Sequence, residues 1–155
     1  MIRLAYAEDE AALMSVAKSI ELFEPEELEM VREMFTHDCD EGDEAESLWL
    51  VDEVDGNTVS AAYCAPERMT NGTWNLLFIG VLPVHQGKGF GSAMVRYVEQ
   101  LLTGKGASLL LVETLADFEH TRAFYRRCGY EEEATIRDYY EVGADKVIYR
   151  KALNR

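Results

Sequence analysis

Residues 74–92 read WNLLFIGVLPVHQGKGFGS and contain the change of pattern that decides the fold. The run Trp74–Leu82 is apolar on both faces, as expected of a central strand that is covered on both sides. A glycine-rich loop, Pro83–Ser92, follows it. From Phe90 to Leu102 the apolar residues recur at helical spacing. The stretch therefore predicts a buried strand, a tight glycine turn and an amphipathic helix.

The sequence on either side continues the alternation of strands and helices. The dipeptides Asp55-Gly56 and Asn71-Gly72 mark turns, and Gly129 stands where a helix would end in a left-handed cap. The acidic stretch Thr36–Ser47 has no period and is predicted to be a surface loop. Strands are predicted at Met1–Ala5, Ser47–Val54, Thr58–Ala65, Ala107–Thr114, Ala134–Glu141 and Lys146–Leu153, and helices from Glu8 to Ile20, from Pro25 to Phe35 and over Glu119–Cys128. This order indicates an α/β fold.

The size and composition suit one soluble domain. The chain has 155 residues, of which 48% are hydrophobic, too many for a disordered chain. We therefore expect residues 1–155 to form a single domain. No apolar run approaches the roughly 20 residues that cross a bilayer, and the start, MIRLAYAEDEAAL, lacks a signal-peptide pattern. We expect a cytoplasmic protein with no membrane partner.

The charge is unevenly placed along the chain. The formal net charge is −14, and residues 1–55 hold 18 acidic and 3 basic side chains, whereas residues 56–155 hold 11 and 12. A negative protein is a poor partner for nucleic acid or an anionic membrane. Two explanations of the acidic part stay open: solvated helix faces, or a field that attracts a cationic ligand.

The cysteines and histidines do not form a recognisable metal motif. The three cysteines are far apart, and the sequence contains no CxxC and no Cys/His ligand spacing. The residues concerned are Cys39, Cys64 and Cys128, with His37, His85 and His120. We expect reduced thiols and no metal.

The loop QGKGFGS (Gln86–Ser92) is the one constellation that suggests chemistry. Glycines let the backbone bring its N–H groups close to a ligand, and the following helix adds the partial positive charge of its N-terminus. Together they make a site for a phosphate or pyrophosphate. The nucleotide P-loop spacing is absent, and the dinucleotide pattern GxGxxG fails because Ser92 stands at its third glycine. The structural alternative, a plain strand-to-helix turn, stays open on the glycines alone.

Two motifs carry a resemblance to a known family. The stretch IGVLPVHQGKGFG (Ile79–Gly91) resembles the acetyl-CoA motif [Q/R]xxGx[G/A] of the GCN5-related N-acetyltransferase (GNAT) family. Gln86, Gly89 and Gly91 hold its three defining positions. The stretch TRAFYRRCGY (Thr121–Tyr130) is similar to the family's helix that ends in [L/F]-Y-x-x-x-G-[F/Y]. The order of elements also agrees with a small, bacterial-type, single-domain member.

The resemblance implies a fold, a co-substrate and a binding site. The GNAT fold has a mixed, mostly antiparallel central sheet flanked by about four helices, and its co-substrate is acetyl-CoA, with no metal. The backbone of Ile79, Gly80 and Val81 would pair with the pantetheine arm, and the Val81 N–H would face the oxyanion. The pyrophosphate would be received by Gln86, Gly87, Lys88, Gly89, Phe90, Gly91 and Ser92.

The resemblance also implies two catalytic residues, each with a structural alternative. Tyr125 matches the tyrosine that protonates the departing thiolate, although it can also be a core tyrosine. Glu113 matches a glutamate that acts as general base in one branch of the family, although it can also be a solvent-facing strand end or an ion pair. Ordered water can replace such a base. The sequence departs from the family at Phe118, where an asparagine that contacts the cofactor is common.

The resulting function is acetyl-CoA-dependent transfer of an acetyl group to a primary amine. The acceptor would be a cationic small molecule, or a lysine or N-terminal amine, because the acidic part of the chain falls on the family's acceptor side. Asp138, Tyr139 and Tyr140 are further candidates for contact with the acceptor, with packing of alternating strand positions as the alternative. The alternative is an acyl-CoA-binding regulatory module without transferase activity. A homodimer is compatible with this fold, because the same open strand can pair across two chains.

Overall fold

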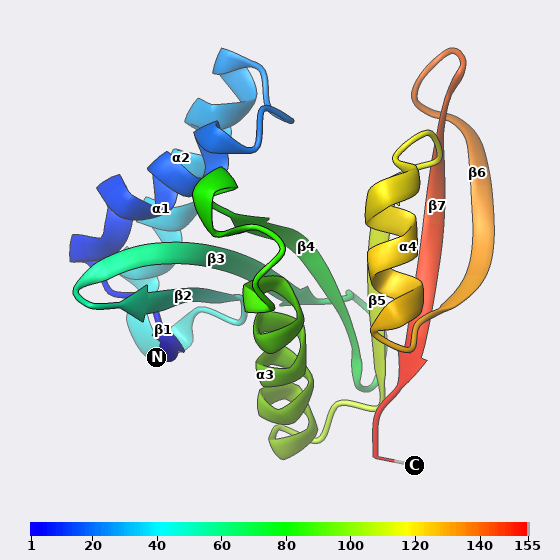
Figure 1. The fold of residues 1–155 in the computed structure, drawn as a ribbon. Helices are drawn as coiled ribbons and strands as arrows, with labels where there is room; N and C mark the ends of the chain where they lie inside the picture. The colour runs from blue at the N-terminus through cyan, green and yellow to red at the C-terminus, as the bar shows by residue number, and fades with distance from the viewer. Residues whose placement is uncertain (155) are drawn as a thin grey trace. The chain divides into compact units, whose positions relative to one another are not determined.

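A computed structural model describes residues 1–154 of the chain, with both helices and strands in the predicted order (Figure 1). The chain divides into two compact units. Unit 1 consists of Met1–Ala65 and Phe78–Tyr97, and unit 2 consists of Pro66–Leu77 and residues 98–154. Strand β4 (Thr73–Val81) and helix α3 (Phe90–Gly104) each run from one unit into the other. The α/β prediction is confirmed.

Unit 1 contains the antiparallel strands β1 (Ile2–Leu4), β2 (Leu48–Val54) and β3 (Asn57–Pro66). The β2–β3 hairpin turns at the predicted dipeptide, with φ of 52° at Asp55 and 81° at Gly56. Positive φ at both central residues is the requirement of a type I′ turn, whose twist matches the strands it joins. The end of β4 follows β3, since the Leu82 N–H donates to the Val59 carbonyl at 2.9 Å.

Helices α1 (Glu10–Ser19) and α2 (Pro25–Glu41) form the core of unit 1 with these strands (Figure 1). Helix α2 begins at Pro25 as predicted, where the Glu24 N–H donates to the Glu27 carboxylate at 3.1 Å. Proline suits this first position because its missing N–H would have no helical partner. The core residues are Leu13, Met14, Val16, Ala17, Phe35, Trp49, Val51, Ala61, Tyr63 and Phe78.

The prediction of a loop over Thr36–Ser47 is wrong. Helix α2 continues to Glu41, and a 3-10 turn covers Gly42–Glu44. The helix continues because Cys39 packs against the core and Asp38 binds the next strand: its Oδ2 accepts hydrogen bonds from Trp49 Nε1 and Ser47 Oγ, both at 2.7 Å. The side of α2 that faces the core therefore extends to Asp38 and Cys39, which a pattern of large apolar residues at helical spacing does not include.

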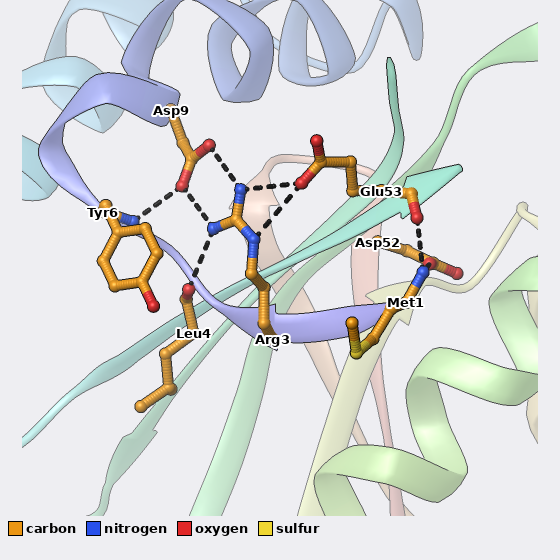
Figure 2. A network of polar contacts seen from close by, with 7 residues as sticks. All are labelled: Met1, Arg3, Leu4, Tyr6, Asp9, Asp52 and Glu53. Atoms are coloured by element: carbon orange, nitrogen blue, oxygen red, sulfur yellow. Dashed lines mark hydrogen bonds and ion pairs between the residues drawn. The ribbon is translucent and has the colours of Figure 1, made fainter. Parts of the chain in front are cut away.

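A network around Arg3 ties the start of unit 1 together (Figure 2). Arg3 binds Asp9 through two hydrogen bonds, of 2.7 and 3.0 Å, and Glu53 at 3.0 Å. These bonds join β1 to the turn before α1 and to β2. The hydrogen bonds with Asp9 raise the pKa of Arg3, and the same bonds lower the pKa of the Asp9 carboxyl. The Met1 ammonium lies 3.1 Å from Asp52 and also donates to the Glu53 carbonyl.

Unit 2 holds the remaining strands. Residues Thr73–Leu76 of β4 pair in parallel with Leu109–Val112 of β5 (Leu109–Leu115). Strand β5 pairs antiparallel with β7 (Ala144–Ala152), and β7 pairs antiparallel with β6 (Glu131–Glu141). Strand β4 belongs to both units. The sheet has seven strands, mostly antiparallel, in the order β1-β2-β3-β4-β5-β7-β6.

Helix α4 (Glu119–Arg127) packs against β5 and β7 on one face of unit 2 (Figure 1). Along β5, Leu110, Val112 and Thr114 are buried, whereas the alternate residues are half-buried. The prediction that β4 is covered on both faces is wrong for Leu77, which is 52% exposed. Within residues 1–154, no helix has the length and apolar character needed to cross a bilayer.

Candidate active site

The glycine loop lies in unit 1, between β4 and α3. Gly87 and Gly89 have φ of 75° and 89°, and a Cβ added at either would meet no atom within 4 Å. Glycine is needed at both positions because L side chains rarely adopt this backbone conformation. The loop backbone therefore turns tightly and has open space beside it. A loop that binds a phosphate group needs both a tight backbone turn and open space for the ligand.

Helix α3 begins at the end of this loop. Its first helical hydrogen bond runs from the Ala93 N–H to the Gly89 carbonyl, at 3.0 Å. The N–H groups of Phe90, Gly91 and Ser92 therefore belong to the first turn, where a helix supplies no acceptor of its own. These donors and the partial positive charge of the helix N-terminus favour an anion here. Lys88, which is exposed, adds a formal positive charge to the loop.

Two side chains fix the entrance of the loop. Gln86 Nε2 donates to the Val81 carbonyl at 3.1 Å, so the amide joins the loop to the end of β4. The Phe90 ring meets the His85 ring edge to face, with centroids 5.7 Å apart. Gln86 and Phe90 therefore hold the loop through their side chains, whereas the glycines contribute backbone.

The three predicted strand residues differ in what they offer. Since the Leu82 N–H faces β3, strand alternation directs the Gly80 N–H to β3 as well, and those of Ile79 and Val81 to the opposite edge of β4. A Cβ on Gly80 would lie 3.1 Å from Val16 Cγ1 and 3.2 Å from Ile20 Cγ2. Gly80 therefore allows α1 to pack closely, while Ile79 and Val81 have backbone groups suited to an extended ligand.

Tyr125 lies on α4 in unit 2 and is 3% exposed. Its ring packs on those of Tyr130 and Tyr149, each with a centroid distance of 6.0 Å. Burial raises the pKa of Tyr125, because the charged phenolate is disfavoured away from water. Tyr125 is therefore a protonated phenol that keeps its O–H as a donor.

Glu113 lies on β5 and is held through both carboxylate oxygens. Oε1 accepts a hydrogen bond from Asn75 Nδ2 at 2.8 Å, and Oε2 lies 2.6 Å from the Lys146 ammonium. Glu113 faces away from α4, because its neighbour Val112 pairs with Tyr149 on the α4 face. Tyr125 and Glu113 are thus on opposite faces of the sheet in unit 2, and the structure does not bring them together.

Sequence reasoning missed three residues around Glu113. Asn75 is 2% exposed and also donates to Glu67 Oε1 at 3.1 Å, and Lys146 is 6% exposed. A signal was present for two of them, since Asn75 interrupts the apolar run of β4 and Lys146 the alternation of β7. Polar side chains at buried strand positions need partners, so each pointed to an unseen contact.

The remaining residues singled out in the sequence lie at the start of α4 and on β6. Phe118 is the residue before α4 and is half-buried. Tyr139 and Tyr140 lie on β6, which is exposed along its whole length, and Asp138 has a φ of 58°. In residues 1–154, one group of three side chains has metal-ligand proximity, namely His37, Asp38 and Glu41 on α2. Asp38 is already bound there by Ser47 and Trp49.

Comparison with known proteins identifies the class that this fold and loop define. The model of the acetyltransferase (GNAT) family matches residues 11–130, and the chain belongs to that family. An acetyltransferase of Yersinia pestis is 27% identical over 89 residues, which are 57% of this chain and 61% of the relative. The match thus spans less than two thirds of that relative.

Solved structures share the fold over the whole length. A GNAT-family protein from Desulfovibrio desulfuricans is 29% identical, with a TM-score of 0.92 and 98% of each chain covered. A Salmonella typhimurium protein, solved with its cofactor acetyl-CoA, is 17% identical, with a TM-score of 0.80 and coverage of 100% of this chain and 94% of that chain. The recognition of the GNAT family and of its fold from the two motifs is confirmed.

Proposed function

We propose that the chain is an acetyl-CoA-dependent N-acetyltransferase whose acceptor is a cationic primary amine. The observation that carries the proposal is the open glycine loop at the N-terminus of α3, with φ of 75° at Gly87 and 89° at Gly89. The pyrophosphate of the co-substrate would bind the backbone of Gly87–Ser92, and its pantetheine arm would follow the edge of β4 that carries the N–H groups of Ile79 and Val81. Gln86 would hold the loop in place.

The reaction needs a base, an oxyanion donor and an acid. A neutral amine attacks the thioester carbonyl, its extra proton is removed, and the sulfur leaves as a thiolate that must be protonated. Glu113 would take the proton, directly or through water, and the Val81 N–H would donate to the oxyanion. Tyr125 would protonate the thiolate.

The acidic N-terminal segment supports a cationic acceptor. Residues 1–55 hold 18 acidic and 3 basic side chains, and most of the acids on α2 are exposed. Such a field raises the local concentration of a cation and is screened by salt. With spermidine as the acceptor probe, we expect its KM to rise several-fold between low and high ionic strength, and the KM of acetyl-CoA to change less. Equal changes would remove this support.

Cofactor binding is the first test of the function. We expect acetyl-CoA to bind with micromolar affinity by calorimetry, and NAD and ATP to bind much more weakly. Gly89→Val should abolish acetyl-CoA binding. The matched control is Gly143→Val, since Gly143 has a φ of 88° and equally open surroundings but lies in the β6–β7 turn. Failure of the native chain to bind acetyl-CoA would refute the proposal.

Transfer is tested separately from binding. Tyr125→Phe should lower kcat by about 10- to 1,000-fold, the range of general acid catalysis, and leave acetyl-CoA affinity within a factor of two. The measurement is thiol release with a panel of amines. Native turnover that Tyr125→Phe leaves intact would assign Tyr125 a structural role, and binding without turnover of any amine would favour a regulatory module.

A further inference from the structure

Lys146 is a buried cation at the centre of a polar cluster in unit 2. It lies on β7 and is 6% exposed, and its ammonium is 2.6 Å from Glu113 Oε2. It also lies over the Tyr139 ring, 3.8 Å from the centroid. Lysine is almost never buried to this degree without a partner, because its charge loses hydration. The Glu113 carboxylate is that partner.

The cluster fixes the direction of the Glu113 carboxylate. Lys146 and Glu113 are diagonal neighbours on adjacent strands, since Lys146 pairs with Leu115 and Glu113 with Ile148. Asn75 holds the second oxygen of Glu113 from the other side, at 2.8 Å. The carboxylate is thus clamped between strands β4 and β7 and has one defined orientation.

Lys146 also sets the charge balance around Glu113. The groups that face Glu113 are Glu67 through the shared Asn75 amide, Lys146 from β7, and Tyr139 and Tyr140 from β6. Lys146 is the cation in contact with Glu113, whereas Arg150, the other diagonal neighbour on β7, lies 4.0 Å from the Glu133 carboxylate. Without Lys146, two carboxylates would share one amide and repel each other. A like charge favours protonation of a carboxylate, and an adjacent cation opposes it.

We propose that Lys146 is the positioning residue of the active site, which holds the Glu113 carboxylate in the orientation from which it can accept a proton from the acceptor amine. This inference rests on the proposed function, because it concerns the base of that reaction. Lys146 does not touch the substrates in this role. It acts through Glu113, by holding one oxygen of that carboxylate while Asn75 holds the other.

Burial would by itself lower the pKa of Lys146, but contacts with Glu113 and Tyr139 outweigh burial and raise it. Lys146 is therefore a stable ammonium across the working pH range, as a fixed positioning charge must be. A lysine that served as nucleophile or proton acceptor would need the opposite shift. The direction agrees with the geometry.

The chain offers a matched control for Lys146. Lys151 lies on the same strand, forms an ion pair with Glu99 at 3.0 Å and lies 5.4 Å from the centroid of the Tyr130 ring. It points to the α4 face, away from Glu113. Lys146→Met and Lys151→Met thus remove the same kind of ion pair from the same strand. Only the first acts on the Glu113 carboxylate.

The experiment follows the Glu113 carboxyl directly by ¹³C NMR titration of the native chain, with the signal assigned by Glu113→Gln. We expect Lys146→Met to raise the titration midpoint by about one pH unit or more. Lys146→Arg and Lys151→Met should leave it unchanged. The midpoint of the acidic limb of kcat/KM for spermidine should move with it, while the KM of acetyl-CoA stays within a factor of two.

Each other outcome has one meaning. If Lys146→Met lowers the melting temperature as Lys151→Met does and leaves the midpoint unchanged, Lys146 is only structural and the inference is wrong. If Glu113→Gln is fully active, the inference is wrong while the transferase function stands. If the native chain neither binds nor uses acetyl-CoA, the proposed function fails, and the NMR titration shows separately whether Lys146 controls Glu113.

Discussion

The Tyr130 N–H donates a hydrogen bond to the Tyr125 carbonyl at 3.0 Å, across the end of α4. The Gly129 N–H bonds the Arg126 carbonyl, also at 3.0 Å, and the φ of Gly129 is 92°. Together they form a Schellman cap, and the ring contact of Tyr125 with Tyr130 is its usual apolar partner. The spacing Y-x-x-x-G-Y is therefore that of a helix cap, which fixes the residue proposed as the acid.

Gly129→Ala should destabilise the protein by about 1–2 kcal/mol, because alanine is strained at positive φ. A Cβ there would lie 3.5 Å from Lys151 Nζ, an ordinary contact, so the cost is in the backbone. Urea unfolding measures it. The control is Gly104→Ala at the end of α3, where a Cβ has open space and φ is not positive; it should leave stability unchanged or raise it by up to about 1 kcal/mol. Equal effects of the two substitutions would contradict the cap.

Buried tyrosines should make the protein less stable in alkali. Burial raises the pKa of Tyr125 and Tyr130, and for Tyr130 the charge of Glu99 adds to it. The stability from a raised pKa is fully present below the unfolded value of about 10 and is lost as pH rises through the folded value. Above about pH 10, the free energy of unfolding should therefore fall by about 1.4 kcal/mol per pH unit for each such tyrosine.

Tyr125→Phe isolates the contribution of one residue. Between pH 6 and 8, the free energy of unfolding should change with pH in the same way for the variant and the native chain. Above pH 10 it should fall less steeply for the variant, and the two slopes should differ by about 1.4 kcal/mol per pH unit. Urea unfolding at several pH values gives both slopes, and other ionising groups cancel in the difference. Parallel curves for the native chain and the variant would show that Tyr125 ionises alike when folded and unfolded.

The local elements could be predicted because each has a local cause. Pro25 starts α2, Asp55-Gly56 turns a hairpin and Gly129 ends α4, and all three act on the backbone of their own neighbourhood. The glycine loop and its helix could be recognised for the same reason. The end of α2 could not, because it depends on Asp38 meeting Trp49, 11 residues further along the chain.

The polar cluster around Glu113 shows the limit for the site. Asn75, Glu113 and Lys146 lie on three different strands, and their contacts depend on strand order and register. The sequence marks each as a polar residue among apolar ones, but it does not show that they meet. The close packing of Gly80 against α1 could not be predicted either, because it depends on how the strand and the helix pack together.

Gly80→Ala should destabilise the protein by about 1–3 kcal/mol, because its Cβ would lie 3.1 Å from Val16 Cγ1 in a filled core. Val16→Ala removes that atom. The double variant should therefore be more stable, by about 1 kcal/mol, than the sum of the two single effects. The control pair is Gly80→Ala with Val51→Ala, another buried valine, whose effects should add. Additivity for both pairs would show that Val16 does not limit the space at Gly80.

Asp38→Ala should destabilise the protein by about 1–3 kcal/mol and shift Trp49 fluorescence to the red. The substitution leaves the Trp49 indole N–H and the Ser47 hydroxyl without the oxygen that both contact at 2.7 Å, and Trp49 is 6% exposed. Asp38→Asn keeps an acceptor oxygen and should recover part of the loss. The exposed Asp40 on the same helix is the control, and Asp40→Ala should cost less than about 0.5 kcal/mol. If Asp38→Ala were as mild, the end of α2 would be held by Cys39 packing alone.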